Sequence, residues 1–372
     1  MRIGVPKEIK NHEYRVGMTP AAVRELTSRG HEVFVETMAG DGIGLGDETY
    51  TRVGAKILKT ADEVFANADM IVKVKEPQPV EIKRLTPKHT LFTYLHLAPD
   101  PEQTKGLLDS GAVCIAYETV TDRFGGLPLL APMSEVAGRM SIQAGAHSLE
   151  KAQGGRGMLL GGVPGVPAAK VVVLGGGVVG TNAARMAMGL EAHVTILDVS
   201  LHRLNELDLQ FGAMLNTIFS TIDAVEEYVT GADLVIGGVL LPGAAAPKLI
   251  TRKMVSEMKK GSVIVDVAID QGGCAETSHA TTHADPTYIV DGVVHYAVAN
   301  MPGAVARTST FALNNATMPF TIQLAEKGAE QAMKDNPHLR AGLNVYKGTL
   351  TYKAVAEAQS LPFKSAESVL GM

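Results

Sequence analysis

The sequence predicts an α/β protein in which a doubly wound parallel sheet is inserted into a second, discontinuous α/β domain. Short apolar segments rich in Val and Ile alternate with helical segments along the whole chain, which is typical of parallel sheets. A glycine-rich turn follows the apolar segment 171–174. Two long helical segments with many small residues, 132–153 and 308–328, flank the middle of the chain and are expected to connect the two domains.

The first part of the chain carries five predicted strands. In a parallel sheet ligands bind beyond the carboxyl ends of the strands. Lys75 and His96 each follow a strand end, which makes both candidate site residues. Thr19 and Pro20 are typical of a helix start and predict a helix at 21–29. The strands are predicted at 2–6, 31–36, 70–74, 90–95 and 112–117, and further helices near 62–66 and at 101–108.

The middle of the chain contains the pattern G-x-G-x-x-G, formed by Gly175, Gly177 and Gly180 with Val178 and Val179 inside it. The first glycine allows a tight turn, the second lets a pyrophosphate approach the backbone, and the third allows close helix–strand packing. The N-terminus of the following helix offers N–H groups to a pyrophosphate. The pattern, placed between a strand and a helix, predicts a dinucleotide-binding Rossmann unit.

A second strand at 193–197 ends on Asp198, 18 residues after the last glycine of that pattern. A carboxylate at this point suits a ribose diol and repels a 2′-phosphate, so we expect the cofactor to be NAD and not NADP. The alternation continues beyond it and completes a doubly wound sheet. Further strands are predicted at 214–219, 233–240 and 262–268 with a pair in 290–298, and helices from 201, at 222–229 and at 251–259.

These elements predict the domain limits. Residues 131–307 would form the NAD-binding domain, and residues 1–130 and 308–372 the substrate domain, which the C-terminal tail completes. Residues 154–167 are rich in Gly and Pro and are expected to form a loop or hairpin. The apolar segment 158–160 within it is either a contact between subunits or a packed loop.

Composition excludes several classes of function. The net charge is −5 without a basic stripe, so a nucleic-acid partner is not expected. Apolar segments are strand-length, so no membrane span is expected, and the first residues lack a signal-peptide pattern. Cys114 and Cys274 form no disulfide framework, which fits the cytoplasm. Cys274, His279 and His283 match no zinc spacing, so no metal is expected.

Four side chains are candidates for chemistry, although each also has an ordinary structural explanation. Arg15 could grip a carboxylate with its guanidinium fork, or be a surface arginine. Lys75 could pair with a carboxylate or polarise a carbonyl, or be solvated. His96 could serve as an acid–base group, or be a buried core histidine. Asp270 follows the last long strand and would lie near the nicotinamide, or be a turn residue.

The chain resembles the family that comprises alanine dehydrogenases and the NAD-binding subunits of proton-translocating transhydrogenases. The resemblance extends over essentially the whole sequence. The chain departs from the family pattern at His279-Ala280, where Arg-Pro is common, at Ala306, where proline is common, and, as a minor change, at Met18, where Leu is usual. The resemblance is carried by Gly4-Val5-Pro6-Lys7-Glu8, Glu13, Arg15-Val16, Thr19-Pro20 and the segments 133–138, 172–180, 266–273 and 300–315.

The resemblance implies an oxidoreductase of the cytoplasm that is a homohexamer and acts in L-alanine catabolism. Its reaction would be the reversible oxidative deamination of L-alanine by NAD to pyruvate and ammonia, with hydride leaving the substrate Cα. The two domains would close over the ligands. One alternative is a transhydrogenase subunit, which does not need Lys75, His96 and Asp270 for amino-acid chemistry. Another is an amino-acid dehydrogenase of different specificity.

The resemblance also implies roles for individual residues. Arg15 and Lys75 would hold the substrate carboxylate and carbonyl region, and His96 and Asp270 would be the acid–base pair. Asp198 would bind the adenosine ribose, with Arg203 nearby. The remaining residues implied in the cofactor groove are Ser134, Ser220, Val239, Leu240, Val267, Ala268, Ile269, Asp270, Val298, Ala299, Asn300 and Met301.

Overall fold

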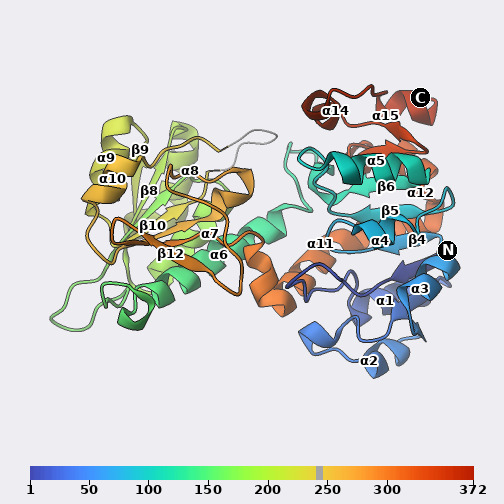
Figure 1. The fold of residues 1–372 in the computed structure, drawn as a ribbon, viewed down its shortest axis with the longest axis horizontal. Coiled ribbons are helices and arrows are strands. Elements are labelled where there is room, and N and C mark those ends of the chain that lie inside the picture. The colour runs from blue at the N-terminus through green and yellow to red at the C-terminus, as the bar shows by residue number, and fades with distance from the viewer. Residues whose placement is uncertain (240–245) are drawn as a thin grey trace. The chain divides into compact units, whose positions relative to one another are not determined.

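The computed structural model describes residues 1–239 and 246–372 and shows two compact units (Figure 1). Unit 1 comprises Met1–Met133 and Val305–Met372, and unit 2 comprises Ser134–Ala304. Both chain ends therefore belong to unit 1. The chain leaves unit 1 in helix α6 (Ala131–Ser148) and is back in unit 1 at helix α11 (Ala306–Lys327). The expected insertion of one α/β fold into another is confirmed.

Unit 1 is built on an eight-stranded sheet of order β15-β14-β6-β5-β4-β1-β2-β3. The strands from the first part of the chain are parallel, and the C-terminal strand β14 pairs antiparallel with β6. The central strands β4 and β6 are buried throughout, as expected for a sheet covered on both faces. The strands are β1 (Arg2–Val5), β2 (Glu32–Glu36), β3 (Lys56–Leu58), β4 (Met70–Val72), β5 (Thr90–Thr93), β6 (Val113–Ala116), β14 (Leu343–Tyr346) and β15 (Thr349–Leu350).

The helices of unit 1 begin at residues suited to that position. The Thr19 hydroxyl accepts a hydrogen bond from Ala22 N with Pro20 in the first turn, as the sequence predicts. Thr60 and Glu63 form a capping box. Besides α11, the helices are α1 (Pro20–Thr27), α2 (Asp47–Thr51), α3 (Ala61–Asn67), α4 (Pro79–Ile82), α5 (Pro101–Ser110), α12 (Ala329–Asp335), α13 (Pro337–Arg340), α14 (Lys353–Gln359) and α15 (Ala366–Leu370).

Unit 2 contains a seven-stranded sheet of order β12-β13-β11-β10-β7-β8-β9, which confirms the doubly wound sheet. Among the strands that the structure describes in this sheet, only β12 pairs antiparallel. Along β7, Val171 and Val173 join the apolar core on one face, whereas Val172 and Leu174 join the core on the other. The strands are β7 (Lys170–Leu174), β8 (His193–Asp198), β9 (Leu215–Phe219), β10 (Leu234–Gly237), β11 (Val263–Asp266), β12 (Thr287–Val290) and β13 (Val293–Tyr296).

The helices of unit 2 are α7 (Val178–Gly189), α8 (Leu201–Phe211), α9 (Ile222–Gly231) and α10 (Arg252–Glu257), together with most of α6. Several predicted bounds differ from the structure here, and the strand predicted at 233–240 ends at Gly237. The predicted strand 262–268 ends at Asp266, and Val267–Gln271 forms a 3₁₀ helix, η5. The predicted helix 132–153 ends at Ser148, and a separate 3₁₀ turn follows at Lys151–Gln153.

Residues 154–167, expected to form a loop or hairpin, contain an isolated antiparallel bridge between Val163 and Val166. In its apolar segment Leu160 is buried, whereas Leu159 is 68% exposed. Cys114 and Cys274 are buried and free. No helix among the described residues is long and apolar enough to cross a membrane.

Close packing of α7 on β7 predicts a sharp difference between two glycines of the same helix. A Cβ at Gly180 would lie 1.8 Å from the carbonyl oxygen of Gly175, whereas a Cβ at Gly189 meets nothing within 4 Å. We expect Gly180→Ala to lower the free energy of unfolding by about 1–3 kcal/mol, as overpacking does. Gly189→Ala, the matched control, should be neutral or stabilising by up to about 1 kcal/mol. Thermal denaturation followed by circular dichroism measures both, and equal melting temperatures would contradict the close packing.

Candidate functional site

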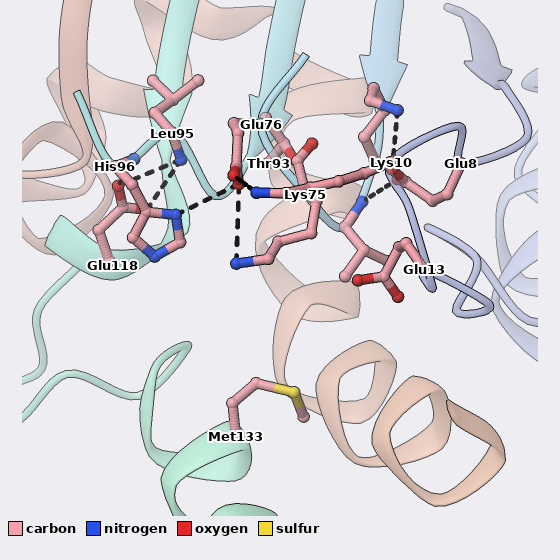
Figure 2. A network of polar contacts seen from close by, with 12 residues as sticks. Glu8, Lys10, Glu13, Lys75, Glu76, Thr93, Leu95, His96, Glu118 and Met133 are labelled. Atoms are coloured by element: carbon pink, nitrogen blue, oxygen red, sulfur yellow. Dashed lines mark hydrogen bonds and ion pairs between the residues drawn. The ribbon is translucent and has the colours of Figure 1, made fainter. Parts of the chain in front are cut away.

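In unit 1, Lys75 and His96 lie just beyond the carboxyl ends of two neighbouring parallel strands, β4 and β5, as predicted. Glu76, the residue after Lys75, connects them. Its Oε2 atom is 3.4 Å from Nδ1 of His96 and 3.7 Å from Nζ of Lys75. Lys10 forms a further ion pair with the other oxygen of Glu76. Figure 2 shows the side chains of Lys75 and His96 both pointing toward this carboxylate.

The Glu76 carboxylate remains ionised in this setting. Burial alone would raise the pKa of Glu76, but the contact with His96 and the charge of Lys75 outweigh it and lower that pKa well below its usual value. The side chains of Glu76 and Lys75 are 14% and 15% exposed. Glu76 therefore supplies a fixed negative charge between a lysine and an imidazole.

The backbone of His96 adopts a left-handed conformation with φ of 48°, which is unusual for a residue other than glycine. Its N–H donates to Oε1 of Glu118 at 2.6 Å. The imidazole stacks against the ring of Tyr94, with 5.6 Å between ring centres, and Tyr94 is itself fixed by a hydrogen bond to the Leu129 carbonyl. The side chain is 42% exposed, so His96 is not a buried core histidine.

Arg15 is 2% exposed and is therefore not a surface arginine. Its Nε and Nη2 atoms donate to the two carboxylate oxygens of Glu13 at 2.7 and 2.5 Å. Its Nη1 atom lies 3.1 Å from the sulfur of Met133. The guanidinium thus has a fixed orientation, because one edge of its fork is held by a carboxylate.

A buried ion group anchors the segment that carries Lys75. Nζ of Lys73, which is fully buried, lies 3.0 Å from Glu8 and 2.8 Å from Glu81. Burial would lower the pKa of Lys73, but the two carboxylates outweigh it and raise that pKa. Glu8 also accepts a hydrogen bond from Val74 N at 2.7 Å. The polar N-terminal loop is thereby tied to the end of β4.

In unit 2 the glycine-rich turn has the geometry that a bound pyrophosphate requires. Gly175 has φ of 94°, and Gly177 precedes the first residue of α7 without a capping side chain. A Cβ at Gly177 would meet nothing within 4 Å, so the backbone at that point is open to a ligand. Val178 is exposed beside it, whereas Val179 is buried against the fold. These residues fit a dinucleotide at the N-terminus of α7.

Asp198 ends β8, as predicted. Its Oδ2 accepts a hydrogen bond from Gly176 N at 2.6 Å, and its Oδ1 accepts one from Ser200 N at 2.8 Å. Arg203 also supports the glycine-rich turn, because its Nε donates to the Gly176 carbonyl at 2.7 Å. Asp198 and Arg203 thus fix the turn in addition to any contact with a ribose.

The other residues expected in the cofactor groove mostly follow parallel strands of the same sheet. Val239 follows β10 and packs near Gly175, and Ser220 follows β9. Val298, Ala299, Asn300 and Met301 follow β13, and Val267, Ala268, Ile269 and Asp270 form part of η5. Ser134 lies in the first turn of α6. Leu240 lies outside the described residues.

Asp270 is exposed on η5, which is anchored from below by Asp266. Oδ2 of Asp266 accepts hydrogen bonds from Cys274 N at 2.9 Å, Ala275 N at 3.2 Å and the Ser278 hydroxyl at 2.5 Å. This buried carboxylate thus fixes the segment 274–278, which follows η5. His279, which departs from the family pattern, stacks on Tyr288 with 3.7 Å between ring centres.

Sequence reasoning found Lys75, His96 and Arg15 in unit 1 but missed the carboxylates around them. Glu118 lies in the 3₁₀ turn Tyr117–Thr119, directly after β6, so the rule that singled out Lys75 and His96 also applies to it. Glu76 is adjacent to Lys75 in sequence. Glu13 gives no such signal, because it does not follow a strand end and its ion pair with Arg15 becomes apparent only in the folded chain.

Comparisons with known proteins agree with the resemblance. A family model described as Alanine dehydrogenase/PNT, N-terminal domain, matches residues 4–137, and one described as Alanine dehydrogenase/PNT, C-terminal domain, matches residues 141–353. Alanine dehydrogenase of Halomonas elongata is 63% identical over 371 residues, which are 100% of each chain. Alanine dehydrogenase of Methanococcus maripaludis is 57% identical, again over 100% of each chain.

Solved structures give the same ranking. A structure of L-alanine dehydrogenase is 52% identical, with a TM-score of 0.94 over 97% of this chain and 99% of that one. A transhydrogenase from Sinorhizobium meliloti is more distant, at 26% identity and a TM-score of 0.83 over 94% of this chain and 100% of that one. The two family models together span most of the chain, which therefore belongs to the alanine dehydrogenase/PNT family.

Proposed function

We propose that this chain is an L-alanine dehydrogenase, which converts L-alanine, NAD⁺ and water to pyruvate, ammonium, NADH and a proton, and also catalyses the reverse reaction. The observation that supports this most strongly is 63% identity to an alanine dehydrogenase over the full length of both chains. The polar groups at the strand ends of unit 1 are of the kind that an amino acid needs, since cationic side chains can bind its carboxylate and an imidazole can exchange its protons.

In this proposal unit 1 is the substrate domain. Arg15 supplies a buried positive charge whose orientation is fixed by Glu13. Lys75 supplies a second positive charge, which forms an ion pair with Glu76. Together they bind the carboxylate and polarise the carbonyl oxygen of pyruvate. The surrounding carboxylates keep both cations in place before substrate arrives, so little ordering is needed on binding.

His96 and Asp270 are proposed as the acid–base residues. During deamination His96 takes a proton from the water that attacks the imino carbon, and it returns a proton to the nitrogen that leaves as ammonia. Asp270 orients the water and the amine. The contact between Nδ1 of His96 and Glu76 leaves Nε2 as the nitrogen that exchanges protons with the substrate.

Unit 2 is proposed as the NAD-binding domain. The open backbone at Gly177 and the N-terminus of α7 would hold the pyrophosphate, and Asp198 would accept hydrogen bonds from the adenosine ribose. When bound, NAD⁺ accepts the hydride that leaves the substrate Cα. The homohexamer implied by the family resemblance stays a prediction.

The transhydrogenase alternative receives less support. The transhydrogenase from Sinorhizobium meliloti is 26% identical to this chain, against 57% and 63% for the two alanine dehydrogenases. Lys75 and His96 also both contact one carboxylate oxygen, Oε2 of Glu76. An amino-acid substrate has a use for this arrangement, whereas hydride exchange between two nucleotides does not.

The direct test is an amino-acid screen with NAD⁺ at alkaline pH, read by NADH absorbance. We expect NADH with L-alanine and much less with lysine, glutamate or leucine. The reverse assay, with pyruvate, ammonium and NADH, should consume NADH. Absence of both signals from folded protein would refute the dehydrogenase assignment and favour the transhydrogenase subunit.

Replacement of the acid–base residues should separate chemistry from binding. His96→Asn is the suitable variant, because asparagine tolerates the left-handed backbone at this position. We expect His96→Asn and Asp270→Asn each to lower kcat by about 10²–10⁴-fold, since the first removes the group that transfers protons and the second removes the carboxylate that orients the water and the amine. The affinity for NADH, measured by fluorescence titration, should stay near the wild-type value. A kcat within a few-fold of wild type would exclude that residue from the role proposed for it.

The ribose assignment predicts the behaviour of Asp198. Because Asp198 also accepts hydrogen bonds from Gly176 and Ser200, asparagine is a better replacement than alanine, since it keeps one of the two acceptor oxygens while it removes the charge. We expect Asp198→Asn to reduce the preference in kcat/KM for NAD⁺ over NADP⁺ by about tenfold or more, which corresponds to at least about 1.4 kcal/mol. An unchanged ratio would contradict a contact between Asp198 and the ribose.

A further inference from the structure

We propose that Glu118 is a positioning residue for His96, which acts on the backbone of His96 and takes no part in proton transfer. The inference rests on the proposed function, since it assigns a purpose to His96 in catalysis. It concerns a residue that was not among the candidates from sequence and that follows a third parallel strand of unit 1, β6.

The Glu118 carboxylate accepts hydrogen bonds from the backbone N–H groups of Leu95 and His96. Oε1 accepts the N–H of His96 at 2.6 Å and that of Leu95 at 3.1 Å, and Oε2 lies 3.2 Å from the same Leu95 nitrogen. One carboxylate thus binds two consecutive N–H groups, as Figure 2 shows. Hydrogen bonds to a carboxylate are stronger than those to a neutral acceptor.

The conformation of His96 explains why such a support is needed. A left-handed backbone is unfavourable for a residue with a Cβ, and φ of His96 is 48°. The hydrogen bonds from Glu118 offset this cost. Without them the peptide would relax toward the right-handed or extended region. The Cα–Cβ bond of His96 would then turn, and the imidazole would leave its place beside Glu76.

The fold places Glu118 where it can do this. Strand β6 pairs in parallel with β5, with Thr93 opposite Ala116, so both strands end at the same level. Glu118 follows Ala116 by two residues, and His96 follows Thr93 by three. The carbonyl side of the same loop is held separately, since the side-chain amide of Gln103 donates to the Leu95 carbonyl at 2.6 Å. The loop is therefore fixed from both sides.

Two variants of Glu118 distinguish positioning from proton transfer. Glutamine keeps a carbonyl oxygen that can accept both N–H groups but cannot act as an acid or base. We expect Glu118→Gln to retain kcat within about threefold of wild type, because the acceptor remains. Glu118→Ala should lower kcat by about 10–100-fold, the usual effect of a reacting group displaced by about 1 Å. KM for NAD⁺ should be unchanged in both, because the contacts lie in unit 1.

A double-mutant cycle with His96 shows whether Glu118 acts through it. On the His96→Asn background no imidazole remains to be positioned, so we expect Glu118→Ala to change the rate by less than about twofold. Single-turnover NADH formation with enzyme in excess over L-alanine measures these slow variants. Glu102→Ala, an exposed glutamate of α5 in the same unit, is the control and should match wild type in both backgrounds.

The outcomes are distinct from a failure of the proposed function. If wild-type protein forms no NADH with L-alanine, the dehydrogenase assignment fails. If wild type is active and Glu118→Gln is as impaired as Glu118→Ala, Glu118 acts by its charge or proton and the positioning role is refuted. Equal effects of Glu118→Ala with and without the imidazole would refute it as well, because the loss would then not pass through His96.

Discussion

Burial of the parallel strands on both faces is the constraint on which the rest of this structure depends. Strands such as β4, β6, β10 and β11 have no face at which a charged side chain could meet water. Charged side chains can therefore reach water only beyond the ends of these strands. Because the strands run in one direction, the carboxyl ends of each sheet share one edge, and the chemistry of each unit is concentrated there.

The same constraint explains how much of the fold the sequence predicted. A strand buried on both faces is a continuous run of Val, Ile and Leu, so β7, β10 and β11 were recognisable and the doubly wound order followed from the alternation with helices. The strand β3 (Lys56–Leu58) was missed because it lies at an edge, is short and is only partly buried. The strand predicted to run to 268 ends at Asp266, because this carboxylate turns the chain by binding two backbone N–H groups.

The site was predictable only in part, for a related reason. A position beyond a strand end can be read from sequence, and this placed Lys75 and His96 correctly. Partners that approach from elsewhere cannot be read in this way. Glu8 contacts Lys73 and Val74 from the N-terminal loop. Glu13, two residues before Arg15, fixes the guanidinium by an ion pair. These carboxylates turn isolated cations into groups of fixed orientation, which only the folded chain reveals.

The discontinuity of unit 1 has a consequence for the order in which the protein can form during synthesis. Strand β6 needs β14 beside it, yet the ribosome must make all of unit 2 before β14 exists. Unit 2 is contiguous and can complete its sheet as soon as it has emerged. Until β14 has been made, β6 is an open sheet edge next to an apolar face. Chaperones and neighbouring nascent chains bind to surfaces of this kind.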